Sequence, residues 1–283
     1  MSKLFQPQYI KQLCKKCGLA PGRKYGQNFL VNPEPLEKML QAGEVSAGDT
    51  VAEVGPGFGA LTLALATRAK TVIAFEIEKK LEPYWREIRK THKNIEIVWG
   101  NVLRGAKLPE GPYKVVANIP YQITSNLIRT FLESENPPRV MILMVQKEVA
   151  ERICAKPGEM SLLSVSVQYF ADAEKIMPVP RSYFWPEPSV DSAIIRIGPR
   201  LGGKKDEFDR FFFRTVRAGF ASRRKILLKN LEAVADKKNR RKLEEIFDEL
   251  GLDTRVRAQE LSVRNWLDLA GELSTYLSAK TVV

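Results

Sequence analysis

Apolar residues in the first half of the chain gather in short continuous runs, separated by longer segments that mix apolar with polar positions. Val72 to Phe75 and Val140 to Val145 are the clearest of these runs, and each has the length of one strand. Continuous hydrophobicity is typical of strands that are covered on both faces. Because such strands alternate with helical segments through residue 145, the pattern predicts an α/β domain with a mostly parallel sheet and helices on both faces.

A different pattern follows near the C-terminus, where apolar residues recur at spacings of three, four and seven. It predicts helix from Phe208 to Leu231, with an interruption around Gly219 to Ser222. The apolar stripe consists of Phe208, Phe212, Val216, Phe220, Leu227 and Leu231. We expect this stripe to form the core of a small helical domain. Since Gly198 to Gly203 is rich in glycine, we expect domains at 1–199 and 200–283, with a further helix within residues 1–19.

The segment from Val115 to Tyr121 carries the most chemical information, because a strand-like run ends there in Asn118-Ile119-Pro120-Tyr121. An aromatic amine is a weak nucleophile because its lone pair is delocalised into the ring. The side-chain oxygen of Asn118 and the carbonyl of Ile119, held at a defined angle by Pro120, could accept the two amine hydrogens and weaken that conjugation. Tyr121 could stack on the base. An ordinary strand-ending turn would explain the same residues.

A glycine-rich turn precedes this segment, in the stretch from Val51 to Gly59, and a helical run from Ala60 to Ala66 follows it. Strand, glycine turn and helix in this order bring the backbone close to a nucleotide-like ligand. The next predicted strand ends at Glu76, where such folds place a carboxylate on ribose hydroxyls. A third predicted strand is followed by Asn101, whose amide could read an adenine edge. The third glycine comes one residue too early for the dinucleotide fingerprint, which disfavours a nicotinamide dehydrogenase.

Six motifs in consistent order resemble those of the ribosomal RNA adenine dimethyltransferase family, a class I methyltransferase family with a Rossmann-like fold. They are Arg23 to Leu30, Val51 to Gly59, Asn118 to Tyr121, Val145 to Val149, Phe184 to Ser192, and Phe220 to Leu231. The resemblance implies a seven-stranded sheet whose last strand is antiparallel, and S-adenosyl-L-methionine as the methyl donor.

Site residues are carried over from the matching motifs. The resemblance implies a donor site that consists of Gln27, Asn28, Leu30, Gly55, Gly57, Glu76, Ile77, Asn101, Val102 and Asn118. The catalytic set is expected to be Asn118, Ile119, Pro120, Tyr121 and Phe184, with the target adenosine between Tyr121 and Phe184.

Two positions depart from the family pattern. Asn101 stands where the family usually has aspartate, and an amide oxygen can still accept from the adenine amine although the charge is lost. Ser161-Leu162 precedes Leu163-Ser164-Val165, where the family commonly has Gly-Arg.

The basic residues are distributed unevenly. The chain has 283 residues and a net charge of +12. Residues 1–30 contain six basic and no acidic residues, residues 200–283 contain 19 basic and 13 acidic residues, and the stretch between them is balanced. Lysine and arginine bind phosphates without reading sequence, so the two ends are the expected RNA footprint. The candidate RNA contacts are Arg23, Lys24, Arg217, Arg223, Arg224 and Lys225.

Other chemistries are disfavoured. Cys14 and Cys17 form a C-x-x-C pair, but a four-ligand zinc site would also need Cys154 and His92, so we expect no metal. The single histidine argues against serine-histidine hydrolysis. No apolar run is long enough to span a bilayer, and no signal-peptide core is present. We therefore expect a cytoplasmic monomer without a membrane partner.

The sequence predicts an enzyme that dimethylates the 6-amino group of two adjacent adenosines in a hairpin near the 3′ end of small-subunit ribosomal RNA, within an assembling ribosomal particle. Three alternatives stay open at this point. They are a large-subunit ribosomal RNA dimethyltransferase that confers macrolide resistance, a non-catalytic assembly or transcription factor of the same fold, and a DNA adenine methyltransferase.

Overall fold

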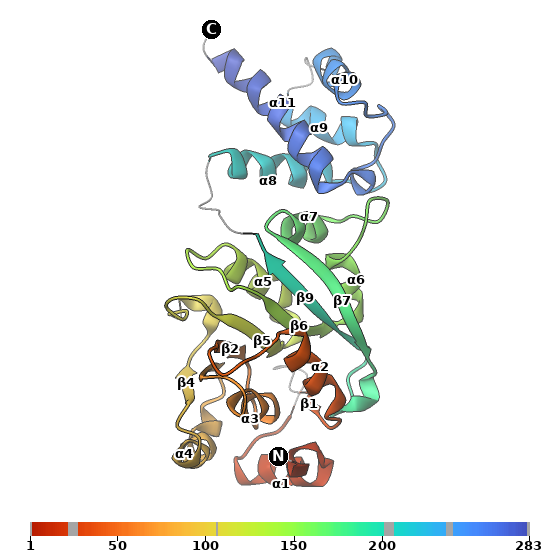
Figure 1. Ribbon diagram of the computed structural model, residues 1–283. Helices are drawn as coiled ribbons and strands as arrows, with labels where there is room; N and C mark the ends of the chain where they lie inside the picture. The colour runs from red at the N-terminus through yellow and green to blue at the C-terminus, as the bar shows by residue number, and fades with distance from the viewer. Residues whose placement is uncertain (1, 22–27, 106, 201–206, 236–239, 282–283) are drawn as a thin grey trace. The chain divides into compact units, whose positions relative to one another are not determined.

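The computed structural model describes residues 2–21, 28–105, 107–200, 207–235 and 240–281 (Figure 1). Its contacts divide the chain into two compact units. The first unit comprises Met1–Glu151 and Asp172–Arg200, and the second comprises Arg152–Ala171 and Leu201–Val283.

A seven-stranded sheet organises the first unit, with the strand order β4-β3-β2-β5-β6-β9-β7. The strands are β2 (Thr50–Val54), β3 (Thr71–Glu76), β4 (Ile95–Trp99), β5 (Lys114–Asn118), β6 (Met141–Gln146), β7 (Ala171–Val179) and β9 (Ser192–Pro199). The five strands from β2 to β6 pair in parallel, whereas β9 pairs with β6 in the antiparallel direction. The predicted sheet, including its antiparallel last strand, is confirmed. A second, two-stranded sheet pairs β1 (Phe29–Leu30) with β8 (Phe184–Trp185).

The helices of the first unit are mostly short. They are η1 (Ser2–Phe5), α1 (Pro7–Lys16), α2 (Glu34–Ala42), α3 (Ala60–Ala66), η3 (Lys79–Leu81), α4 (Glu82–Thr91), η4 (Val102–Arg104), η5 (Tyr121–Ile123), α5 (Thr124–Leu132), α6 (Lys147–Ile153) and η6 (Arg181–Tyr183). Along the described parts of the chain, no helix combines the length and apolar character that crossing a membrane requires.

Buried side chains explain why the apolar runs become strands. Consecutive residues from Met141 to Val145 are all buried, so β6 is covered on both faces as its uniform hydrophobicity predicts. One apolar core joins α2 and α3 to β2, β5, β6 and β9. A second core joins η1, α1 and α4 to β3 and β4. The N-terminal helix is therefore part of the folded unit.

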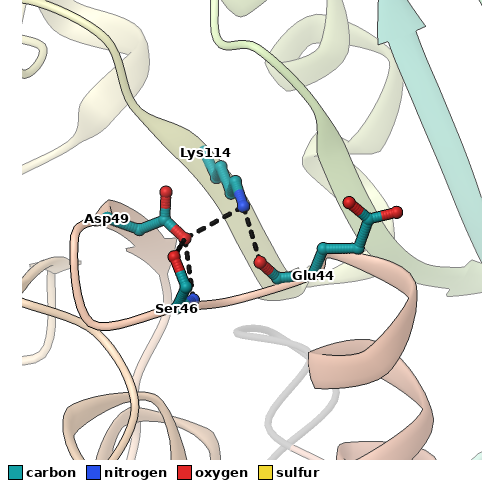
Figure 2. A network of polar contacts seen from close by, with 4 residues as sticks. All are labelled: Glu44, Ser46, Asp49 and Lys114. Atoms are coloured by element: carbon teal, nitrogen blue, oxygen red, sulfur yellow. Dashed lines mark hydrogen bonds and ion pairs between the residues drawn. The ribbon is translucent and has the colours of Figure 1, made fainter.

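A polar network fixes the start of β5 to the loop before β2. Figure 2 shows Lys114 donating both to the carboxylate of Asp49 at 2.9 Å and to the backbone carbonyl of Glu44 at 2.8 Å. The same Asp49 oxygen accepts from the backbone N–H and the hydroxyl of Ser46. Lys114 begins β5 and Asn118 ends it, so this network holds the strand at the end opposite the residues of chemical interest.

The second unit is helical. It contains α7 (Leu162–Gln168), α8 (Glu207–Gly219), α9 (Leu227–Ala235), α10 (Arg240–Glu249), η8 (Ala258–Glu260) and α11 (Val263–Thr281). Its core includes every residue of the predicted apolar stripe, with Phe208 and Phe220 at the margin. The predicted interruption of the helical segment after Phe208 is also found, because α8 ends at Gly219 and α9 begins at Leu227. A Cβ atom at Gly219 would overlap the Trp266 ring, and Asn230 donates to the carbonyls of Gly219 and Ser222 across the turn.

Residues 152–171 belong with the C-terminal helices, although they precede the last strands in sequence. Met160 and Val165 lie in the core of the second unit. The Tyr169 ring packs on Phe212 at 4.3 Å between centroids, and its hydroxyl donates to Asp209. The proposed division into domains at residues 199 and 200 stays a prediction; these contacts identify an inserted segment that hydrophobic periodicity did not assign to the small unit.

Replacing Lys114 by Met should lower the free energy of unfolding by about 1 to 3 kcal/mol at pH 7, because Asp49 and the Glu44 carbonyl lose a charged donor. Burial acts to raise the pKa of Asp49, but hydrogen bonds from Lys114 and Ser46 overcome it and lower the pKa below its ordinary value of 3.8. A lowered carboxyl pKa contributes stability that is present above pH 3.8 and lost as the pH falls further. Urea unfolding should therefore show a smaller difference between the two proteins at pH 3.

Lys107→Met supplies the control, because its ion pair with Glu110 is exposed and should change stability little. Equal effects of the two substitutions at pH 7 would contradict a stabilising role of the buried network.

Candidate functional site

A cavity of about 380 Å³ lies in the first unit at the carboxyl ends of β2, β3 and β5. The chain runs outward from β2 to β3 and β4 and then returns to place β5 on the other side of β2. This reversal of strand order opens a crevice at the strand ends, where α/β sheets bind their ligands. Every described residue of the predicted donor and catalytic sets lines this one cavity.

The glycine turn between β2 and α3 forms one wall of the cavity. Gly55 adopts a φ of +74° and Gly59 a φ of +84°, a left-handed conformation that favours glycine. A Cβ atom at Gly59 would also lie only 2.7 Å from the Trp85 ring. The Trp85 indole donates to the Gly57 carbonyl at 3.0 Å, and the Tyr84 hydroxyl donates to the Phe58 carbonyl at 2.8 Å. Sequence reasoning missed these two aromatic residues, because no motif in the sequence links α4 with the glycine turn more than 20 residues earlier.

Glu76 is held rigidly at the end of β3. Its carboxylate accepts backbone N–H groups from Gly57 at 3.2 Å and from Ile77 and Glu78 at 2.8 Å each. Burial raises the pKa of Glu76, and these backbone hydrogen bonds oppose the rise. Two carboxylate oxygens offer about four acceptor positions, so acceptor capacity is left for ligand hydroxyls. The geometry suits the predicted role at a ribose.

Asn101 follows β4 and caps η4. Its side-chain oxygen accepts the N–H of Leu103 at 2.9 Å. Only an oxygen can accept that hydrogen, so the other arm of the amide is the NH2 group. One of the two lone pairs of the oxygen that was expected to read the adenine amine is therefore already used by the backbone, and the role at the adenine stays a prediction. Ile77, which is 56% exposed, and the buried Val102 complete this end of the cavity.

The Asn118 to Tyr121 segment leaves the sheet between β5 and α5. The N–H of Ile119 donates to the Met144 carbonyl at 3.2 Å, which fixes the backbone to β6 just beyond Asn118. The Tyr121 hydroxyl hydrogen-bonds with the hydroxyl of Ser192 on β9 at 2.8 Å. Asn118 and Tyr121 both line the cavity. The backbone just after Asn118 is anchored to β6, and the Tyr121 ring is anchored to β9.

The small sheet brings two distant motifs to the same cavity. Leu30 pairs with Phe184 and Phe29 pairs with Trp185. This pairing carries Asn28 and Leu30 to the cavity wall beside Phe184. Phe184 is only 4% exposed and also belongs to an apolar core, so its side chain supports the fold as well as facing the cavity.

The described candidates for RNA contact are not among the residues that line the cavity. Arg217 lies on α8, while Arg223, Arg224 and Lys225 occupy the turn before α9, and all four side chains are exposed. Arg23, Lys24 and the donor-site candidate Gln27 lie outside the described residues. A role in RNA binding stays a prediction for all six basic residues.

Glu53 is a cavity residue that sequence reasoning did not select. It lies in β2, is only 2% exposed and lines the cavity near Gly55. Burial raises the pKa of Glu53 to about 8, and repulsion from Glu76 adds to the rise, whereas the Thr62 hydroxyl opposes it. An acidic residue inside the apolar run from Val51 to Val54 was the available signal. Leu4 and Ile10 also line the cavity from η1 and α1, which no motif indicated.

The fold and the cavity together define a class I methyltransferase, in which the glycine turn and the acid of the next strand meet at the switch in strand order. The sequence profile described as ribosomal RNA adenine dimethylase matches residues 21–275, and the chain belongs to this family. It is an enzyme that uses S-adenosyl-L-methionine to methylate ribosomal RNA.

Individual relatives agree with this assignment. A protein from Bacillus mycoides named ribosomal RNA small subunit methyltransferase A is 37% identical over 286 residues, which cover 96% of this chain and 98% of the relative. The crystal structure of a dimethyladenosine transferase from Plasmodium falciparum aligns with a TM-score of 0.76 at 29% identity, covering 87% of this chain and 97% of that one. The 23S rRNA methyltransferase ErmE aligns with a TM-score of 0.72 at 29% identity, covering 87% and 100%.

The residues present fit S-adenosyl-L-methionine. The buried Glu76 carboxylate, oriented by three backbone N–H groups, suits the ribose hydroxyls. The left-handed glycine turn lets the backbone approach the ligand closely. One oxygen of Glu53 is buried and has no hydrogen-bond partner within the described parts of the chain, which suits a ligand that brings hydrogen-bond donors.

Asn101→Asp should tighten the binding of S-adenosylhomocysteine by about tenfold, because a second carboxylate oxygen would replace an NH2 group that cannot accept from the adenine amine. Isothermal titration calorimetry on the purified proteins measures this change. Asn126→Asp on the exposed surface of α5 makes the same substitution away from the cavity and should leave affinity unchanged. Weaker or equal binding by Asn101→Asp would contradict the assignment of the amide arms.

Proposed function

We propose that this enzyme dimethylates the 6-amino groups of two adjacent adenosines in a hairpin near the 3′ end of small-subunit ribosomal RNA. The observation that carries the proposal is the position of Asn118 to Tyr121 at the end of β5, in the same cavity as the glycine turn and Glu76. The choice of the small subunit is supported by relatives of matching length that bear that name. An assembling ribosomal particle as substrate, a monomeric state and a cytoplasmic location are parts of the same proposal.

Polarisation of the target amine is the main chemical task of the chain's own residues. The Asn118 side-chain oxygen and the Ile119 carbonyl accept the two amine hydrogens and return lone-pair density to the nitrogen. S-adenosyl-L-methionine, when bound, supplies an activated methyl group, so alignment of the amine matters more than a strong general base. Tyr121 does not serve as such a base, because burial raises the pKa of its hydroxyl despite the hydrogen bond with Ser192.

The base must leave its stack to reach this cavity. The Tyr121 ring, anchored through Ser192, offers a face on which an extruded adenine can stack. Phe184 is the other aromatic residue proposed to contact the base, and its packing in the core keeps the ring in place. Rigid walls suit two successive transfers, because the monomethylated amine must return to the same place with one hydrogen fewer.

Basic residues in the second unit would hold the RNA backbone. Arg210, Arg214 and Arg217 are exposed along α8, and the turn from Arg223 to Lys225 adds three more cations. These groups bind phosphates and orient the hairpin without reading its sequence. Arg23 and Lys24 are proposed to contribute in the same way.

Dimethylation of large-subunit RNA is the second candidate, and the likeness to the 23S rRNA methyltransferase ErmE favours it. The higher identity to proteins named for the small subunit argues against it. Mass spectrometry of RNA from undermethylated small and large subunits, incubated separately with enzyme, would distinguish the two. Methylation of duplex DNA alone, or donor binding without turnover on any RNA, would contradict both candidates.

Asn118→Ala should lower the rate of methyl transfer to undermethylated small subunits by at least about 10²-fold, since one of two acceptors on the reacting amine is lost. Transfer of labelled methyl groups measures the rate. Asn126→Ala provides the matched control, because that asparagine is exposed on α5 and should leave the rate unchanged. Full activity of Asn118→Ala would refute the proposed role of the amide.

Replacing Arg223, Arg224 and Lys225 together by Ala should weaken RNA binding and reduce the slope of log affinity against log salt by up to about three, one for each phosphate that is no longer neutralised. Filter binding to the isolated hairpin at several salt concentrations measures both quantities. Arg264→Ala also removes a cation from the second unit, but this arginine pairs with Asp268 and should change the slope little. An unchanged slope in the triple variant would remove these residues from the RNA footprint.

A further inference from the structure

Helix α1 lies beside the cavity and has no function in the mechanism above. Its buried face consists of Ile10, Leu13 and Cys14. Ile10 also lines the cavity, as does Leu4 from the preceding η1, so the N-terminal segment forms part of the cavity wall. The opposite face of α1 is exposed and polar. An exposed surface beside an active site is a place where a large substrate can make contact.

Four lysines give this segment a positive charge. Lys3, Lys11, Lys15 and Lys16 are all exposed, and residues 2–21 contain no acidic residue. In the ranges that the structure describes, none of the four lysines forms an ion pair. Lys15 and Lys16 lie in the last turn of α1, where a cation interacts favourably with the helix dipole, and the charge of Lys16 also acts on Glu87 of α4. These two lysines therefore have a local explanation, whereas Lys11 in the middle of the helix does not.

Lys11 lies at the rim of the cavity. Its Nζ atom is 5.5 Å from the centre of the Trp185 ring. Ile10, the residue before Lys11, and Phe184, the residue before Trp185, both line the cavity. Lys11 is not among the described residues that line the cavity, so it lies beside the proposed donor site and not in it. Contacts between α1 and β8 thus place a positive charge close to the aromatic residue that is proposed to contact the base.

The Trp185 ring holds Lys11 without satisfying its hydrogen-bond donors. An aromatic face attracts an ammonium group electrostatically, but it offers no oxygen acceptor. The Lys11 ammonium carries three N–H donors. Among the described residues, Glu187 is the acidic residue nearest to Trp185 in sequence after β8, and it pairs with Arg181 at 2.9 Å. Lys11 can therefore bind an anion without first breaking an ion pair.

The anion that fits this position is a phosphate of the RNA backbone. An adenosine that enters the cavity must leave its stack, which costs free energy that contacts with the protein have to offset. The phosphates on either side of that adenosine come to the mouth of the cavity with it, because they are joined to the same ribose. Lysine binds a phosphate as a point charge and releases counterions. The donor carries no phosphate, but it has a carboxylate, and measurements of donor binding separate these two anions.

We propose that Lys11 binds one of the two phosphates that flank the target adenosine, and so holds the RNA backbone while the base lies in the cavity. The contact does not read the RNA sequence. This inference rests on the proposed function and adds to it a phosphate contact from α1 in the first unit. The contact is the same in the bound complex and in the transition state, so it affects the binding of RNA and not the chemical step.

Lys11→Met removes the charge and keeps most of the apolar side chain that packs near Trp185. It should reduce the slope of log affinity against log salt for the isolated hairpin by about one, the value for one phosphate contact. The KM for undermethylated small subunits should rise about fivefold with kcat unchanged, because the lost contact is equally strong before and during the reaction. Binding of S-adenosylhomocysteine, measured by calorimetry, should not change. Lys11→Arg keeps the cation and should retain the wild-type slope.

Lys70→Met is the matched control. Lys70 is an exposed lysine of the same unit, but it directly precedes β3 and so lies at the end of that strand opposite the cavity. Its replacement by Met removes the same charge and should leave the salt slope and the KM unchanged.

Chemically altered hairpins locate the phosphate that Lys11 contacts. A methylphosphonate has nearly the shape of a phosphate but lacks its charge. When it replaces the phosphate on one or the other side of the target adenosine, one of the two hairpins should bind the wild-type enzyme about fivefold more weakly. Lys11→Met should bind that hairpin as well as it binds the unaltered one, because the two changes remove the same interaction. Equal losses in both proteins, or no loss at either position, would overturn the proposal.

The outcomes separate this inference from the proposed function. An unchanged slope and KM in Lys11→Met would remove Lys11 from the RNA contacts, while methylation of small subunits by the wild-type enzyme would leave the proposed function intact. A large loss of S-adenosylhomocysteine binding in Lys11→Met would assign the ammonium to the donor carboxylate and would also overturn the proposal. Failure of the wild-type enzyme to methylate small subunits would overturn the proposed function itself. If Lys11→Met unfolds at a lower temperature than the wild-type enzyme, Lys11→Gln repeats each measurement with another uncharged side chain.

Discussion

The hydrogen bonds that hold Glu76 are the constraint on which the rest of the site depends. Three backbone N–H groups, one from the glycine turn and two from the residues that follow β3, converge on one buried carboxylate. They join the ends of β2 and β3 and set the shape of the turn between them. The indole of Trp85 and the hydroxyl of Tyr84 secure the same turn from α4. A site held by its own backbone can bind a ligand with little rearrangement.

Two buried carboxyl groups lie on neighbouring strands in this cavity. Burial raises the pKa of Glu53, and the Glu76 carboxylate acts in the same direction. Asn101, which follows β4, carries no charge, and its side-chain oxygen accepts the N–H of Leu103. The cavity therefore brings two buried acids together with the neutral amides of Asn101 and Asn118.

The two units differ in the polar groups that they present. The first unit encloses the cavity with strand ends and short turns, and its polar groups are tied into backbone hydrogen bonds. The second unit has an apolar core around Phe212 and Trp266 and an exposed surface rich in arginine and lysine. Phosphate recognition requires accessible flexible cations, whereas amine polarisation requires fixed acceptors. Under the proposed function, the first unit would supply the fixed acceptors and the second unit the cations.

Local pattern alone determined the strands, the glycine turn and the interrupted helix after Phe208, because each depends on residues close together in sequence. The motifs also indicated which residues would meet, and the described members of that set line one cavity. Tertiary structure alone decided the contacts that have no local signature. These contacts join segments that are far apart in the chain. The Trp85 ring packs close to Gly59, and the Ser192 hydroxyl hydrogen-bonds with the Tyr121 hydroxyl. Helix α1 contributes an apolar residue to the cavity lining, and residues 152–171 belong to the second unit. The raised pKa of Glu53 belongs to the same group, since it depends on how completely neighbouring strands and helices exclude water from the carboxyl group.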